Sequence, residues 1–174
     1  MKKKYRSPYE AYPFLSDPSD DLRCDFEIMT DRLASMTGLL ASLCPEEELK
    51  EELLRIDRLI YHLNPSLRTF FSIKEEEMQF LLERVGELEV ENASLYDTFI
   101  LPSGSTRASL AHLLRVDSKA LVRLLYRYEE KGNKIETQIF DFSNLLSGYF
   151  FHLAMKLNSL DEVEEISYKS RNYK

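Results

Sequence analysis

The feature that most constrains the fold of this chain is the return of apolar residues every three or four positions along stretches of helix length. The first stretch, residues 22–43, carries this pattern at Phe26, Met29, Leu33, Met36, Leu39 and Leu40. This spacing follows the 3.6-residue turn of an α-helix and predicts one apolar face. Because the 174 residues include only five glycines and six prolines, the chain has few turns, which favours long helices over a many-stranded sheet.

Four more stretches are predicted to be helical, and helix-ending residues separate some of them. They comprise residues 45–63, 75–93, 105–131 and 135–158. The prolines at 45 and 65 and the Gly132-Asn133 pair are typical stop signals. The last stretch is the most apolar, so we expect it at the centre of the fold or at a subunit interface. Five helices with short connections predict an all-α, up-and-down bundle.

The ends of the chain differ from this helical middle. Residues 1–20 contain three prolines and show no sustained period, which predicts an irregular N-terminal arm. The helical bundle domain is expected over residues 21–160. Residues 161–174 are expected to form a tail that is either a short helix or frayed.

Composition excludes several classes of partner. The net charge is −7, whereas a nucleic-acid-binding protein needs a broad basic surface. No apolar run approaches the roughly 20 residues of a membrane span, and no apolar segment follows the N-terminal lysines as it would in a signal peptide. The two cysteines, Cys24 and Cys44, are expected to be free thiols in a reducing compartment. We therefore expect a cytoplasmic protein that binds neither nucleic acid nor membrane.

Several common catalytic sites lack their signatures. A di-iron bundle needs Glu-x-x-His pairs, but the residues three positions before the histidines are Leu59, Ser109 and Tyr149. Two isolated cysteines and three scattered histidines do not have zinc-ligand spacing, and neither a phosphate-binding loop nor a dinucleotide fingerprint is present. A Ser-His-Asp triad has no local signature here and stays open from the sequence.

A basic stripe stands out within this acidic chain. Residues 105–131 contain six lysines or arginines and three acids. Four of the basic residues recur every fourth position and so form one stripe along the helix: Arg115, Lys119, Arg123 and Arg127. Such a stripe can follow an extended anion such as a polyphosphate, or it can be a solvated face paired with acidic helices. The preceding turn, with Ser105 at its end, can receive an anion or can simply cap the helix.

Three blocks of sequence resemble the ATP:cob(I)alamin adenosyltransferase family. "FILPSGS…ASLAHLLR" resembles the family pattern FxLPGGS…AxLHxARTxxRRAER, with Phe99, Leu101, Pro102, Gly104, Ser105, His112, Arg115 and Arg123 at matching positions. "LRCDFEIMTDRLASMTGLL" resembles RVEAYGxxDELNSxLG, with Arg23, Asp31, Leu33, Ser35 and Gly38 in register. "NLLSGYFFHLA" resembles NRLSDYLFxLA, with Asn144, Leu146, Ser147, Tyr149, Phe151, Leu153 and Ala154 retained.

The resemblance implies a fold and a reaction. Members are five-helix bundles, ferritin-like in architecture, that assemble as homotrimers with ATP and the corrinoid at subunit interfaces. They move the 5′-deoxyadenosyl group of ATP onto the cobalt of cob(I)alamin and release triphosphate, with Mg²⁺ assisting. Phe99 matches the phenylalanine that crowds the lower face of the corrin and displaces its axial ligand. Asp31 and Arg115 match an ion pair that shapes the corrin pocket across the interface.

The nucleotide half of the implied site departs from the family pattern. Lys119, Arg123, Asn144 and Ser105 are the residues that the resemblance assigns to ATP. Lys119 replaces an arginine, which removes a bidentate fork, and Val122 replaces a glutamate. The arm lacks the Thr/Arg/Gly/Asp-rich loop with which members usually wrap the triphosphate.

Three hypotheses follow from these observations. The first is an active corrinoid adenosyltransferase in which lysines or Arg6 of the arm replace the missing loop. The second is a catalytically degenerate relative that binds corrinoid or serves as a helical interaction module. The third is a helical bundle whose basic stripe is purely structural. We favour the enzyme over the degenerate relative, and both over the third.

Overall fold

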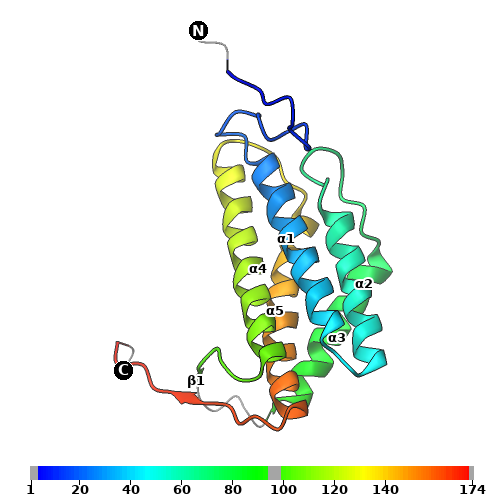
Figure 1. Cartoon of the computed structure of the whole chain (residues 1–174), viewed down its shortest axis with the longest axis vertical. Helices are drawn as coiled ribbons and strands as arrows, with labels where there is room; N and C mark the ends of the chain where they lie inside the picture. The colour runs from blue at the N-terminus through cyan, green and yellow to red at the C-terminus, as the bar shows by residue number, and fades with distance from the viewer. Residues whose placement is uncertain (1–3, 94–98, 173–174) are drawn as a thin grey trace.

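The chain folds into a bundle of long helices that alternate in direction (Figure 1). A computed structural model describes residues 4–93 and 99–172. Within these residues the helices are α1 (Arg23–Ser42), α2 (Glu47–Leu63), α3 (Glu75–Glu91), α4 (Thr106–Glu130) and α5 (Thr137–Leu160). The predicted five-helix bundle is therefore confirmed, and each predicted helix end lies within two residues of the observed one.

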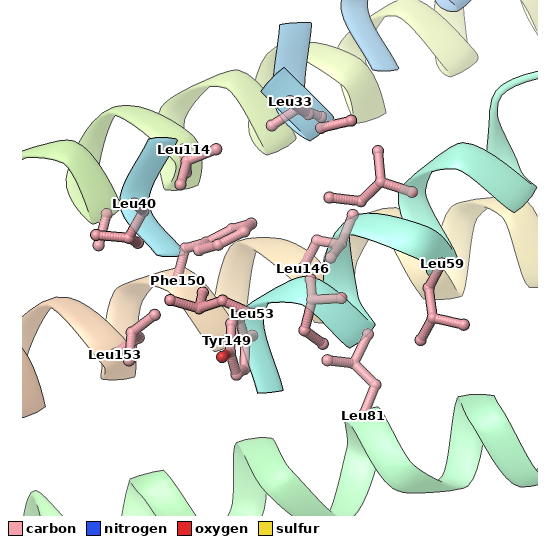
Figure 2. Close-up of a cluster of buried hydrophobic side chains, with 14 of the residues drawn as sticks. Leu33, Leu40, Leu53, Leu59, Leu81, Leu114, Leu146, Tyr149, Phe150 and Leu153 are labelled. Atoms are coloured by element: carbon pink, nitrogen blue, oxygen red, sulfur yellow. The ribbon is translucent and has the colours of Figure 1, made fainter. Parts of the chain in front are cut away.

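Neighbouring helices pack side by side around the core. α1 packs against α2 and α4, and α5 packs against α4 and α3. All five helices contribute to the apolar cluster in Figure 2, in which the side chains of Leu53, Leu114, Leu146 and Phe150 are fully or almost fully buried. As its sequence predicts, α5 contributes many of the most buried side chains.

Local signals set the limits of α4. The Ser105 side chain caps its N-terminus by accepting a hydrogen bond from the Ala108 N–H at 3.1 Å. Its C-terminus is followed by Gly132, whose φ of 86° is the left-handed conformation that ends many helices. The basic stripe thus lies on one uninterrupted helix.

A two-stranded antiparallel sheet joins the segment before α4 to the C-terminal tail. β1 (Phe99–Ile100) pairs with β2 (Ser167–Tyr168), with Phe99 opposite Tyr168. The expectation that the tail is helical or frayed is wrong at these residues. A two-residue strand gives no period in the sequence, and this one is held by a partner almost seventy positions away. The sheet lies at the end of the bundle remote from the N-terminus (Figure 1).

The N-terminal arm is tied to the other end of the bundle through Arg68. The Arg68 guanidinium pairs with Asp17 at 2.9 Å and with Glu27 at 2.6 Å, and it lies 3.7 Å from the centroid of the Phe14 ring. Both cysteines are free thiols, as predicted, and both are buried. None of the helices in the described part of the chain combines the length and apolar character needed to cross a membrane.

Candidate functional site

The exposed face formed by α4 and α5 carries most of the predicted nucleotide residues. At one end of this face, the rings of Tyr126 and Phe140 lie 4.8 Å apart between centroids. At the other end, the Arg115 guanidinium lies 5.7 Å from the centroid of the Phe151 ring. Between these two contacts, the helical repeat brings three exposed side chains onto the same face: Lys119, Arg123 and Asn144. We call these three residues, together with Arg115, the α4/α5 face.

Arg115 is the most unusual charge on the α4/α5 face. Its side chain is half-buried, and its Nε atom is buried without a hydrogen-bond partner among the described residues. Burial lowers the pKa of the Arg115 guanidinium. A half-buried arginine with an unpaired nitrogen is energetically costly, so an anionic group bound beside it would stabilise it.

Asp31 lies on a different face of the bundle. The Tyr61 hydroxyl donates a hydrogen bond to Asp31 Oδ1 at 2.8 Å, which places Asp31 beside α2. The next residue, Arg32, points the other way and pairs with Asp117 of α4 at 2.8 Å. Since Arg115 faces α5 and Asp31 faces α2, the fold does not bring the two together within one chain.

A cavity adjoins Asp31 at the junction of the arm, α1 and α2. Its volume is about 320 Å³, and its lining residues are Tyr12, Leu15, Glu27, Ile28, Asp31, Tyr61 and Asn64. Mostly aromatic, aliphatic and carboxylate groups surround it, so Asp31 sits at the rim of a partly apolar hollow.

Phe99 occupies β1 and projects away from the core. Its side chain is 75% exposed, although large aromatic residues are usually buried. Ser105, six residues later, serves as the α4 cap, and its own N–H donates to Asn158 Oδ1 at 2.9 Å. The cap interpretation of Ser105 is therefore confirmed, while its contact with a nucleotide stays a prediction.

His112 is buried on α4, one turn before Arg115. Its side chain is 4% exposed, and neither ring nitrogen has a hydrogen-bond partner in the described part of the chain. Burial, with a further contribution from the positive charge of Arg115, lowers the His112 pKa from 6.5 to about 4. The ring is therefore neutral at physiological pH.

Comparison with known proteins identifies the family. The cobalamin adenosyltransferase profile matches residues 17–157. The chain belongs to the cobalamin adenosyltransferase family. A protein of Bacillus subtilis (strain 168) named corrinoid adenosyltransferase is 31% identical over 159 residues, which cover 86% of this chain and 81% of that protein.

Solved structures of PduO-type adenosyltransferases from Lactobacillus reuteri share the fold. An arginine-to-lysine variant complexed with ATP is 27% identical, with a TM-score of 0.74 over 86% of this chain and 88% of that one. A phenylalanine-to-histidine variant complexed with cobalamin and ATP is 25% identical, with a TM-score of 0.73 over 89% and 87% of the two chains. The resemblance read from the three sequence blocks is thus confirmed at the level of family and fold.

Within this member of the family, some residues near the site carry little sequence signal. Tyr61, which binds Asp31, lies in the middle of the chain, where the family resemblance is only helical. Phe151 was visible as a retained aromatic residue, but nothing in the sequence placed it beside Arg115. Asn158 follows the last matched block and belongs to no motif, although its amide contacts the turn after Phe99.

The buried His112 makes a prediction about pH and stability. Its folded pKa is lowered, so between pH 6.5 and 4 the unfolded chain takes up a proton that the folded chain does not. The free energy of unfolding should therefore fall as the pH drops through this window, by up to about 3 kcal/mol from this residue. His112→Leu should flatten that part of the curve, measured by urea unfolding at several pH values. His62→Leu, at an exposed position of α2, is the control; equal slopes in the His112→Leu variant and the parent would contradict the prediction.

Proposed function

We propose that this protein transfers the 5′-deoxyadenosyl group of ATP to the cobalt of a reduced corrinoid. The cobalt(I) electron pair forms the new bond to C5′ of ATP, while the C5′–O bond breaks and its electrons leave with inorganic triphosphate. The observation that carries the proposal is family membership together with the retained Phe99, Asp31 and Arg115. The relative solved with cobalamin and ATP binds both of the substrates that this reaction needs.

In the proposed mechanism, Phe99 acts on the lower face of the corrin. An exposed phenyl ring can occupy the space of the lower axial ligand without donating electrons to cobalt. Loss of that donor raises the reduction potential of Co(II), which makes the nucleophilic Co(I) state accessible. The protein supplies no nucleophile of its own, so its contribution is to orient the substrates and adjust the electronic state of cobalt.

Asp31 and Arg115 are proposed to pair between subunits of a homotrimer. The unpaired Nε of Arg115 and its position away from Asp31 in the single chain both support a contact between copies. Such a pair would give the Arg115 guanidinium an anionic partner and would line the corrinoid pocket. We further propose that the trimer works in the cytoplasm.

The basic residues of the α4/α5 face are proposed to bind the triphosphate of ATP. Lys119 and Arg123 attract phosphate oxygens, Asn144 contacts the nucleoside, and Ser105 lies at the N-terminus of the same helix. Mg²⁺ would neutralise part of the phosphate charge and would be carried by the nucleotide. Stabilising the leaving triphosphate lowers the barrier to C5′–O cleavage.

A comparison of spacing supports a nucleotide role for Lys119 despite its departure from the family pattern. The substituted phenylalanine and arginine of the two Lactobacillus reuteri structures are twenty residues apart. Phe99 and Lys119 are also twenty residues apart in this chain. The arginine-to-lysine variant of that enzyme was solved with ATP bound, so a lysine at the corresponding position is compatible with nucleotide binding.

Truncation of Lys119 or Arg123 should weaken ATP binding. Each loses one charge-assisted phosphate contact, so Lys119→Ala and Arg123→Ala should each raise the Kd for ATP by roughly tenfold. Isothermal titration calorimetry measures this change, and the Kd for the corrinoid should stay within about twofold. Arg127→Ala is the matched control, since Arg127 is the next exposed residue of the stripe. An equal effect at Arg127, or none at the other two, would count against a defined phosphate site.

The second candidate function is a degenerate relative that binds corrinoid without reacting. The departures at Lys119 and Val122 and in the arm favour it. Incubation with ATP, Mg²⁺ and chemically reduced cobalamin separates the two candidates, because the enzyme yields adenosylcobalamin and triphosphate in equal amounts. Corrinoid binding with no product would select the degenerate relative instead.

A further inference from the structure

Asn158, in the last turn of α5, connects three separate segments of the chain. Its Oδ1 accepts the hydrogen bond from the Ser105 N–H at 2.9 Å, and its Nδ2 donates to the Ser103 carbonyl at 3.1 Å. The same Nδ2 also donates to Glu165 Oε1 of the tail at 3.0 Å. Asn158 is 1% exposed, so its amide relies on these partners rather than on bulk water. Such a satisfied buried amide strongly defines local geometry.

The turn before α4 is shaped to fit around this amide. Gly104 has a φ of 128°, a conformation that side chains rarely adopt. A Cβ atom at Gly104 would also overlap the Asn158 carboxamide. The glycine therefore permits both the backbone conformation and the close approach, which indicates a specific contact between the turn and α5.

Phe99 depends on these backbone contacts for its position. With 75% of its side chain exposed, the ring has little packing of its own to hold it. The segment is held instead by the Leu101 N–H, which donates to the Ile166 carbonyl at 2.8 Å, and by the pairing of β1 with β2. Asn158 holds the turn that follows Phe99, and through Glu165 it also holds the residues just before β2. The turn that follows Phe99 and the residues that lead into β2 are therefore both hydrogen-bonded to the Asn158 side chain.

We propose that Asn158 is a positioning residue for Phe99. It fastens the Phe99 segment to α5 and the C-terminal tail, so that the phenyl ring is already in place when the corrinoid arrives. A ring on a loose segment would have to be ordered at the moment it displaces the axial ligand, which reduces the fraction displaced. This role rests on the proposed function, because it assumes that Phe99 contacts the corrin.

The test measures the coordination of cobalt directly. Purified full-length protein is mixed with ATP and cob(II)alamin, and electron paramagnetic resonance gives the ratio of cobalt without its lower axial ligand to cobalt that retains it. Asn158→Leu removes all three side-chain hydrogen bonds and should lower this ratio about tenfold. Glu165→Ala cuts only the link to the tail and should lower it less. The Kd for ATP should be unchanged in Glu165→Ala, because Glu165 contacts Asn158 from the tail and not the turn that leads into α4.

A remote core variant controls for general loss of stability. Leu63 is fully buried near the C-terminus of α2, at the end of the bundle opposite the strands (Figure 1). Leu63→Ala should destabilise the fold and leave the coordination ratio of the folded protein at the parent value. A fall in the ratio with Leu63→Ala as large as with Asn158→Leu would overturn the positioning role.

The remaining outcomes separate this inference from the proposed function. If the parent protein never yields cobalt without its axial ligand, the proposed function fails and the role of Asn158 falls with it. If the parent yields it and both variants keep the parent ratio, only the positioning role is overturned. Where Asn158→Leu does not fold, Glu165→Ala decides, since a lowered ratio supports the inference and a parent ratio overturns it.

Discussion

Phe99→Ala should retain corrinoid and ATP binding while its kcat for adenosylation falls by at least about 100-fold, or roughly 2.7 kcal/mol in the activation barrier. The expected loss is large because the phenyl ring acts on cobalt itself. Without it, the lower axial ligand stays bound, Co(II) resists reduction, and little nucleophilic Co(I) forms. Binding should persist because a relative in which a phenylalanine is replaced by histidine was solved with cobalamin and ATP bound.

The measurement pairs a rate with a spectrum. Adenosylcobalamin formation is followed by absorbance under a fixed reductant, and paramagnetic resonance reports the axial ligand of cob(II)alamin. Ile166→Ala is the matched control, because it truncates an exposed apolar side chain next to β2, the strand that pairs with β1. The substitution keeps the backbone hydrogen bond from the Leu101 N–H to the Ile166 carbonyl. A Phe99→Ala enzyme with the parent rate, or one that loses corrinoid binding entirely, would refute the proposed role of the ring.

Asp31→Ala and Arg115→Ala should each lower kcat/KM for the corrinoid by about 100-fold or more, because each leaves its partner's charge uncompensated at the proposed interface between copies. The two residues lie on different faces of a single chain, so the proposed pair forms only between copies. Loss of activity in each single variant does not show that the two residues come from different copies, but a mixture of the two variants does. Mixing the two variants should restore part of the activity.

The restoration follows from symmetry. In a closed trimer, an interface that takes Asp31 from an Arg115→Ala chain and Arg115 from an Asp31→Ala chain is intact, whereas the opposite interface lacks both groups. After random subunit exchange, about a quarter of all sites should be intact, and about a quarter of the parent activity should return. The control is each variant taken through the same exchange with more of the same variant, which should restore no activity. No recovery after exchange, verified by mass spectrometry of the intact trimer, would exclude a pair shared between subunits.

The helices and their order can be predicted from the sequence, because the signals that start, continue and end a helix are local. Helical periodicity, the prolines after α1 and α2, and Gly132 depend on neighbours within a few residues. The same is true of the cap at Ser105 and the spacing that puts Arg115, Lys119 and Arg123 on one face of α4. The family resemblance likewise rests on three ordered blocks that can be compared residue by residue.

The contacts around the candidate site depend on residues far apart in the chain. Tyr61 binds Asp31 from another helix, and Phe151 meets Arg115 across the α4/α5 boundary. The strand pairing of Phe99 with Tyr168 leaves no signal in the sequence, because two-residue strands have no detectable alternation. The pattern of polar and apolar residues cannot show which distant partner satisfies a buried amide such as Asn158.

By itself, therefore, the sequence determined the helices, their order, the basic stripe and the family. Tertiary structure alone decided that Asp31 and Arg115 face apart and that Asn158 joins the Phe99 turn to the tail. The physical reason is that helix formation is governed by spacing within a few turns. The position of an exposed side chain such as Phe99 is instead set by long-range hydrogen bonds, which exist only after the bundle has closed.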